Sequence, residues 1–208
     1  MIPKRVIVYV DGFNLYHALD DLNQDHLKWL DLWSLSEKLI AKNGLETIVA
    51  VKYFTAFATW RPESLRLHQK YVAALKARNV TVILGRFKEK RNRCKSCGVQ
   101  YISHEEKETD VNIGSHLISD GLRNRYDRAI VISADTDLNG VVDLARQETD
   151  EKIIHLVTPP GRHSRNRAAL FAITRGRIKQ SLLPETCQTK EGKTIVRPTK
   201  YQPPVNVD

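Results

Sequence analysis

The chain has 208 residues, of which 41% are hydrophobic and 27% are charged, a composition typical of a globular protein with one domain and at most a small appendage. No apolar run approaches the roughly 20 residues of a membrane-spanning helix, and the first residues show no signal-peptide pattern, so we expect no membrane association and a cytoplasmic location. The three cysteines are too few for a disulfide scaffold.

Strand-like and helix-like segments alternate along the chain, which predicts an α/β fold with a central, mostly parallel, five-stranded sheet and helices on both faces. The expected strands are short runs of β-branched, aromatic and aliphatic residues at 6–10, 47–57, 80–84, 128–133 and 152–157. The expected helices, by apolar periodicity and caps, lie at 14–19, 31–42, 62–78, 110–122, 138–147 and 167–173.

Two segments interrupt this alternation. Residues 85–108 carry a basic run, a cysteine pair and an acidic cluster, and we interpret them as an insertion or long loop, which is usually functional in a compact domain. Residues 181–208 are polar and contain prolines, which favours an extended, loosely held tail. The expected organisation is therefore one domain over residues 1–180, with an insertion, followed by a tail.

The formal net charge of +9 is unevenly distributed. Residues 158–208 hold ten basic and three acidic side chains, and residues 76–95 hold eight basic side chains and one acid. Basic patches bind polyanions through phosphate contacts and counterion release, although they also serve as solubilising surface. The candidate nucleic-acid contacts are Arg86, Lys88, Lys90, Arg91, Arg93, Arg162, Arg165 and Arg167.

Four aspartates occupy positions where parallel sheets bind ligands, beyond the carboxyl ends of the strands. Asp11 directly follows the first expected strand, Asp135 and Asp137 follow the fourth, and Asp110 begins a helix. Each one alone also suits a turn or a helix cap, but together they exceed what turn chemistry requires. Because clustered carboxylates repel one another, we expect them to be catalytic residues that hold Mg²⁺ or Mn²⁺, which prefer oxygen ligands.

Two neutral side chains are candidates for positioning the substrate. Asn14 lies about one helical turn after Asp11, so its amide can orient a water molecule or a phosphate oxygen. Ser133, just before Asp135, can donate a hydrogen bond to a carboxylate or a phosphate. Each residue also has a structural interpretation, as a helix-starting polar group or a satisfied hydroxyl at the end of a strand.

Three motifs in this order resemble the NYN domain family, a group of PIN-like nucleases. They are Asp11-Gly12-Phe13-Asn14 after a strand, Glu106-Lys107-Glu108-Thr109-Asp110-Val111, and Ser133-Ala134-Asp135-Thr136-Asp137. The resemblance covers roughly residues 4–157. It implies a PIN-like, three-layer fold and a metal-dependent ribonuclease site in which the four aspartates match the family's acidic residues and Asn14 its polar residue.

The chain departs from the family pattern at two adjacent positions in the second motif, Glu108 and Thr109. The family commonly has Lys-Gly-hydrophobic-Asp where this sequence has Lys107-Glu108-Thr109-Asp110. Glu108 adds an acid beside the site, so the departure bears on how the substrate is positioned and leaves the metal ligand Asp110 in place. Lys107 is a further candidate for positioning the substrate.

The cysteine pair Cys94-Lys95-Ser96-Cys97 has the spacing of half a structural zinc site, and His104 is the nearest third ligand. The fourth ligand is left open among His68, His116, Cys187 and another chain. Two reduced thiols in a basic loop are the alternative to zinc.

The sequence therefore predicts hydrolysis of phosphodiester bonds in RNA, most simply single-stranded RNA, on whose bases Phe13, Tyr16 or Trp60 could stack. One alternative is a catalytically inactive nucleic-acid-binding module of the same fold, and another is a Toprim-like or phosphatase-like phosphoryl hydrolase. A dinucleotide-dependent oxidoreductase is disfavoured, because no G-x-G-x-x-G follows the first strand. A homodimer is a further expectation.

Overall fold

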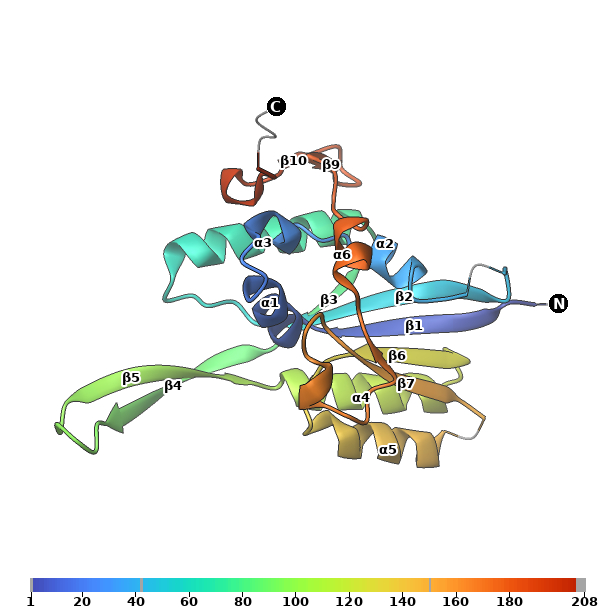
Figure 1. Cartoon of the computed structure of the whole chain (residues 1–208), viewed down its shortest axis with the longest axis horizontal. Helices are drawn as coiled ribbons and strands as arrows, with labels where there is room; N and C mark the ends of the chain where they lie inside the picture. Colours follow the sequence, from blue (N-terminus) through green and yellow to red (C-terminus); the bar gives the residue numbers. More distant parts are fainter. Residues whose placement is uncertain (1, 42, 150, 205–208) are drawn as a thin grey trace.

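The computed structural model describes residues 2–41, 43–149 and 151–204. Its centre is a six-stranded sheet in the order β3-β2-β1-β6-β7-β8, in which every neighbouring pair is parallel (Figure 1). The strands are β1 (Lys4–Asp11), β2 (Glu46–Thr55), β3 (Thr81–Leu84), β6 (Arg128–Ile132), β7 (Ile153–Thr158) and β8 (Phe171–Ala172). The predicted α/β fold with a parallel sheet is confirmed.

The sheet has six strands and not the predicted five. The sixth, β8, occupies the segment for which we expected a short helix at 167–173. It is tied to β7 at both ends, because the Leu170 amide donates to the Leu156 carbonyl at 2.8 Å and the Ile173 amide to the Thr158 carbonyl at 2.8 Å. A strand of two residues is too short to show alternation in the sequence, and this is why the helix prediction was wrong.

Helices cover both faces of the sheet, which makes three layers (Figure 1). One face packs against α1 (Gly12–Asp20), α2 (Leu32–Glu37), α3 (Pro62–Ala77) and α6 (Arg175–Lys179), and the other against α4 (Thr109–Leu122) and α5 (Leu138–Glu148). Strand β1 serves both layers: Val6, Val8 and Val10 join the first core, whereas Ile7 and Tyr9 join the second. This alternation is the reason that a continuous apolar run marks a buried parallel strand.

Local capping explains where α2 begins. The Asp31 carboxylate accepts hydrogen bonds from the backbone amides of Trp33 and Ser34 at 3.0 and 3.1 Å, as an N-cap does. The helix ends at Glu37, earlier than expected, and Lys42, where the prediction placed its end, lies outside the described residues.

The segment at 85–108 forms a hairpin and not a long loop. Strands β4 (Arg86–Arg93) and β5 (Gln100–Lys107) pair antiparallel as a separate sheet, and Figure 1 shows this hairpin, which we call the arm, projecting from the body. At its tip the Cys94 amide donates to the Val99 carbonyl at 2.8 Å, and Gly98 has a φ of 72°. The tight turn and the paired strands together give the arm its elongated shape.

The segment after residue 181, for which we expected an extended tail, is folded onto the body as far as Tyr201, and residues 202–204 are exposed. It contains the hairpin β9 (Thr186–Gln188) and β10 (Thr194–Val196). Cys187, Ile195 and Tyr201 are buried against Trp29. The Trp29 indole also donates to the Pro184 carbonyl at 2.9 Å. Residues 205–208 lie outside the described part of the chain.

Three short 3₁₀ helices complete the described structure: η1 (Asp25–Lys28), η2 (His163–Arg165) and η3 (Thr199–Tyr201). Across the described ranges, the longest apolar stretch of helix falls short of what a bilayer crossing requires.

A buried ionic cluster ties α4 to the sheet. Asp120 is only 1% exposed and forms an ion pair with Lys52 of β2. Its carboxylate also accepts hydrogen bonds from the Tyr9 hydroxyl at 2.7 Å and the Arg125 guanidinium at 3.0 Å. Burial raises the pKa of Asp120, but the hydrogen bonds from Lys52 and Tyr9 outweigh it and hold the pKa below its ordinary value. The carboxylate is therefore ionised and fixes α4 against β1 and β2.

Candidate active site

Asp11 lies at the point where the strand order reverses, between the carboxyl ends of β1 and β6. Its side chain is only 4% exposed. One carboxylate oxygen accepts from the Asn14 amide at 3.0 Å, which caps α1, and the other accepts from the Ser133 hydroxyl at 2.8 Å. The residue therefore joins the ends of two neighbouring strands.

The segment after β6 is held to the same place by two further hydrogen bonds. Ser133 accepts from the Asp135 amide at 3.0 Å, and the Asn14 side-chain carbonyl accepts from the Ala134 amide at 2.9 Å. Ser133 is fully buried, so it orients Asp11 and Asp135. Asn14 likewise fixes the loop that carries Asp135, and it also reaches the cavity described next.

The start of α4 brings the third carboxylate. Glu108, immediately before the helix, has a φ of 80°, a left-handed conformation that non-glycine residues rarely adopt. The preceding Glu106 turns back and accepts from the Thr109 amide at 3.2 Å and from the Thr109 hydroxyl. This turn places Asp110 in the first helical turn, beside the ends of β1 and β6.

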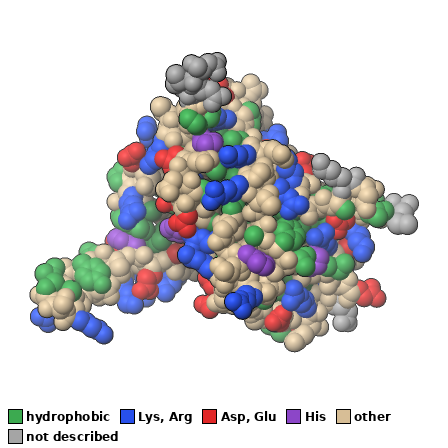
Figure 2. Space-filling view, viewed as in Figure 1, with side chains coloured by type: hydrophobic (Ala, Val, Ile, Leu, Met, Phe, Trp, Pro, Cys, Tyr) green, Lys and Arg blue, Asp and Glu red, His purple; other side chains and the backbone are tan. Residues whose placement is uncertain are grey.

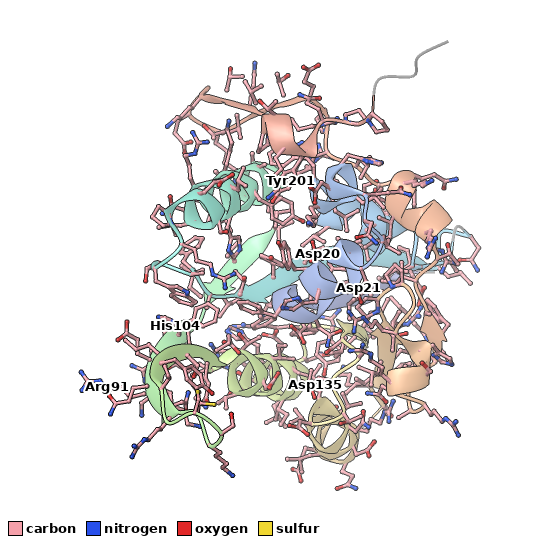
Figure 3. All side chains as sticks on the ribbon, turned by 60° about the vertical axis from the view of Figure 1, so that its left-hand side comes forward. Asp20, Asp21, Arg91, His104, Asp135 and Tyr201 are labelled. Carbon is pink, nitrogen blue, oxygen red and sulfur yellow. The ribbon has the colours of Figure 1, made fainter. Side chains whose placement is uncertain are left out.

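These elements enclose a cavity of about 420 Å³, which we call the carboxylate cavity. Its lining residues are Asp11, Phe13, Asn14, His17, Asp21, Glu106, Thr109, Asp110, Asp135, Arg162 and Arg165. Asp135 is labelled in Figure 3, where it lies near the ends of the helices below the sheet. Four carboxylates at the strand ends and the start of α4 thus share one hollow.

Three of the predicted catalytic and substrate-positioning residues do not line the carboxylate cavity: the buried Ser133, Asp137 and Lys107. Asp137 is exposed at the start of α5, where its amide donates to Asp135 at 3.0 Å. Lys107 forms an ion pair with Glu105 at 3.2 Å. Asp137 still contributes to the local charge, because its negative charge raises the pKa of Asp110.

Sequence reasoning did not select Glu106 or Asp21 as site residues. Glu106 stood inside the second motif, which was the only signal that could have found it. Asp21 lies at the end of α1 and forms an ion pair with Arg162. No local pattern connects residues that are so far apart in the sequence.

Two carboxylates of this cavity, Asp11 and Asp110, have raised pKa values and so resist ionisation. Burial raises the pKa of Asp11 to about 6, despite the hydrogen bonds from Asn14 and Ser133, and the charges of Asp110 and Asp135 add to the rise. Burial also raises the pKa of Asp110, followed by the charges of Asp135 and Glu106. Repulsion of this kind is relieved by a bound cation and is common at functional sites.

The oxygen-only donors of the cavity fit a hard divalent cation such as Mg²⁺ or Mn²⁺. Their spacing is wide, however: among the described residues, no three His, Cys, Asp or Glu side chains lie close enough to share one ion directly. Mg²⁺ usually retains several water molecules and takes only one or two protein carboxylates. The donor set therefore fits an ion whose coordination is partly completed by water.

The predicted phosphate contacts fall into two groups. Arg162 and Arg165 line the carboxylate cavity, whereas Arg167 is exposed outside it. Figure 2 shows acidic and basic side chains interspersed along the arm, and Figure 3 shows Arg91 extending from it into solvent. The exposed basic residues of β4 are Arg86, Lys88, Lys90, Arg91 and Arg93. Arg86 and Lys90 form ion pairs with Glu108 and Glu105, at 2.7 and 2.8 Å.

The structure does not assemble the expected zinc set. Cys94 and Cys97 lie at the tip of the arm, whereas His104 pairs with Glu89 further along the hairpin and stacks on Trp60, with ring centroids 3.6 Å apart. The Ser96 hydroxyl and the Cys97 amide lower the pKa of Cys94 to about 6. The pair is therefore two thiols, one of them acidic, without a third ligand among the described residues.

Comparison with known proteins agrees with this architecture. The sequence profile described as the NYN domain matches residues 5–172. The protein named 6-hydroxy-3-succinoylpyridine 3-monooxygenase HspA, from Pseudomonas putida, is 27% identical over 200 residues, which cover 80% of this chain and 62% of that protein. The chain thus spans about three-fifths of the length of that relative.

A solved structure of a protein of unknown function from Vibrio parahaemolyticus has a similar fold. Its TM-score is 0.54 at 18% sequence identity, and the match covers 88% of this chain and 98% of that chain. At this identity the likeness concerns the fold alone.

Proposed function

The chain belongs to the NYN domain family, which is part of the PIN-like nucleases, and from this premise we propose that it hydrolyses phosphodiester bonds of single-stranded RNA with the help of Mg²⁺ or Mn²⁺. One observation carries the proposal: Asp11, Asp110 and Asp135 converge on one cavity from the ends of β1 and β6 and the start of α4. Glu106 adds a fourth carboxylate.

Asp11 and Asp135 would hold the cation, with water molecules completing its coordination, and the cation would lower the pKa of bound water and offset charge on the phosphate. Asn14 and Ser133 keep Asp11 and the Asp135 loop in place through the hydrogen bonds described above. Asp110 is the carboxylate to which we assign acceptance of a proton from the attacking water, because it is exposed at the cavity, unlike the buried Asp11, and burial and the charge of Asp135 raise its pKa. Arg165, exposed at the rim, would contact a neighbouring phosphate.

The test is Asp11→Asn. Cleavage of a labelled single-stranded RNA in Mn²⁺ is expected to fall by about 100-fold or more, whereas Asp143→Asn, an exposed change on α5 away from the cavity, is expected to retain wild-type activity. EDTA should stop wild-type cleavage. If Asp11→Asn cleaved as fast as the wild type, the catalytic assignment would be lost.

The alternative from the sequence, an inactive RNA-binding module, makes the opposite prediction. Such a protein would bind labelled RNA in fluorescence anisotropy equally well with EDTA or Mn²⁺ and would release no product in either. These assays examine RNA as the substrate and the metal requirement directly, whereas self-association is a separate part of the proposal that light scattering of the purified protein tests.

A second candidate function is favoured by one observation. The relative HspA is named for a reaction on a pyridine, and an aromatic cavity adjoins the carboxylate cavity of this chain at Phe13 and His17. Action on a free heteroaromatic molecule would be detected as consumption of a hydroxypyridine in the presence of dioxygen and a reductant. Absence of such turnover alongside RNA cleavage would favour the nuclease.

A further inference from the structure

A second cavity, of about 290 Å³, lies on the other side of the first turn of α1, and we call it the aromatic cavity. Phe13 and His17 belong to the walls of both cavities. Gly12 permits this arrangement, because a Cβ at this position would lie 2.6 Å from the Phe54 carbonyl oxygen. The helix therefore starts tightly against β2 and separates two hollows that open beside each other.

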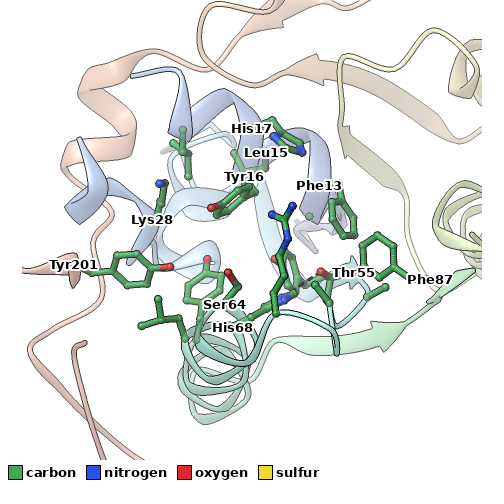
Figure 4. A pocket seen from close by; sticks show the side chains of 18 of the residues that line it. Phe13, Leu15, Tyr16, His17, Lys28, Thr55, Ser64, His68, Phe87 and Tyr201 are labelled. Carbon is green, nitrogen blue, oxygen red and sulfur yellow. Dashed lines mark hydrogen bonds between the residues drawn. The ribbon is translucent and has the colours of Figure 1, made fainter. Parts of the chain in front are cut away.

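Aromatic rings from six parts of the chain line this cavity (Figure 4). They are Phe13, Tyr16, Tyr53, Trp60, Tyr71, Phe87 and Tyr201. Phe87, at the base of the arm, contacts Phe13 and Trp60 edge to face, with centroids 5.3 and 4.6 Å apart. Figure 4 shows Phe13 and Phe87 at one end of the cavity and Tyr201 with Lys28 at the other. Such walls favour a planar ring.

The polar side chains around the cavity are hydroxyls and imidazoles, together with the cations Lys28, Arg61 and Lys200. Burial lowers the pKa of His68 to about 4, so its imidazole is uncharged, and its Nε2 lies 3.2 Å from the Thr55 hydroxyl. Lys28 is neutralised by Asp20 and Asp25. The Ser64 hydroxyl also faces this space (Figure 4). A neutral imidazole and hydroxyls match the uncharged hydrogen-bonding edge of a heteroaromatic ring.

We propose that the aromatic cavity binds one unstacked base of a single-stranded polynucleotide while an adjoining phosphate of the same strand occupies the carboxylate cavity. The inference rests on the proposed function. The volume is near the lower limit, about 300 Å³, of ligand pockets, so it suits one ring system. A paired base cannot enter without leaving its duplex, and the site therefore selects unpaired strands.

The experiment uses the whole chain in EDTA, so that binding is measured without cleavage; because the carboxylates then lack a cation and repel phosphate, the aromatic cavity is measured on its own. The probe is an eight-nucleotide single-stranded RNA with one 2-aminopurine, whose fluorescence falls when the base stacks on an aromatic ring. Ser64→Trp fills the cavity from an exposed position on α3, and Gln69→Trp, exposed on the same helix but outside the cavity, is the matched control. Melting temperatures confirm that both variants fold.

We expect the wild type and Gln69→Trp to bind the probe equally and to quench it. Ser64→Trp should bind about tenfold more weakly without quenching, since one stacked base accounts for an effect of this size. An abasic site in place of 2-aminopurine should weaken wild-type binding about tenfold and leave Ser64→Trp unaffected, because both changes remove the same contact. Equal losses from Ser64→Trp on the intact and abasic strands would overturn the proposal.

Two further outcomes show whether the bound ring belongs to a strand or to a free molecule, and whether the base site and the nuclease activity stand or fall separately. If nicotinate or free adenosine 5′-monophosphate bound more tightly than the strand and required an open cavity, the ligand would be a free molecule and the strand assignment would be wrong. If quenching occurred but RNA was never cleaved in Mn²⁺, the nuclease proposal would fail while base binding stood. If Ser64→Trp cleaved and bound RNA as well as the wild type does, the base site would be rejected and the nuclease proposal would stand.

Discussion

The carboxylate cavity and the arm both carry many charges, but they hold them differently. In the cavity, Asp11 is buried, is oriented by two donors and has a raised pKa. On the arm, Lys90 and Glu105 are exposed and balance each other across β4 and β5. Charge that is buried and uncompensated indicates a site awaiting a ligand, whereas exposed and paired charge is readily replaced. Four predictions examine this contrast.

The largest effect on stability is expected at the buried ionic cluster. Asp120→Ala leaves Lys52 in the interior without its carboxylate, and removing one partner of a buried pair costs about 3–5 kcal/mol. Urea unfolding measures the difference. Asp143→Ala, which removes an exposed partner of Arg146, is the control and should cost less than about 1 kcal/mol. Equal losses in the two variants would remove the distinction between buried and exposed charge.

The second prediction concerns pH. The pKa of Asp11 is raised from 3.8 to about 6 in the folded chain, so between these values the unfolded state ionises first and stability falls as pH rises. The loss amounts to about 3 kcal/mol and is complete above pH ~6. In EDTA, the wild type should therefore lose about 3 kcal/mol relative to Asp11→Asn between pH 4 and 7, whereas the opposite contribution of His68, whose pKa is lowered to about 4, is common to both proteins. Identical pH profiles would show that Asp11 ionises without penalty.

The third prediction concerns the left-handed residue before α4. Glu108→Gly removes a strain of about 1–2 kcal/mol and loses the exposed ion pair with Arg86, worth at most about 1 kcal/mol. A net gain of about 1 kcal/mol is expected by urea unfolding. Arg86→Ala isolates the ion pair and should change stability by less than about 1 kcal/mol. Destabilisation by the glycine would mean that Glu108 has another role at the base of the arm.

The smallest effect on stability is expected on the arm itself. Arg91→Ala should leave the melting temperature unchanged, because the side chain extends into solvent (Figure 3). If the arm contacts RNA, the same change should reduce the slope of log affinity against log salt by about one. An unchanged slope would restrict phosphate contacts to the body of the protein.

Much of the fold follows from the sequence, because buried parallel strands read as apolar runs and their ends carry the aspartates. Asp11, Asp110 and Asp135 were found in this way, and the structure places all three on one cavity. Glu106 was not selected, because its side chain turns back toward Thr109 only through the left-handed turn at Glu108, which the sequence does not reveal. The short strand β8 had too few residues to form a pattern.

The aromatic cavity had no sequence signature for a different reason. Phe13, Trp60 and Tyr201 come from three distant parts of the chain, and each alone resembles an ordinary packing residue. Their convergence requires the arm to project from the body and the last described segment to fold back over Trp29. Such contacts are set by tertiary packing, which no local periodicity records.

The shared wall formed by Phe13 and His17 has an evolutionary consequence. The carboxylates depend on β1, β6 and α4, whereas the neighbouring hollow, which α1 and β2 also line, is completed by α3, Phe87 of the arm and η3. Mutations in the latter elements can remodel what is recognised while the acidic half stays intact. A scaffold divided in this way can acquire new specificities by drift on one side only, and distant relatives of one ancestor can come to process chemically unlike molecules.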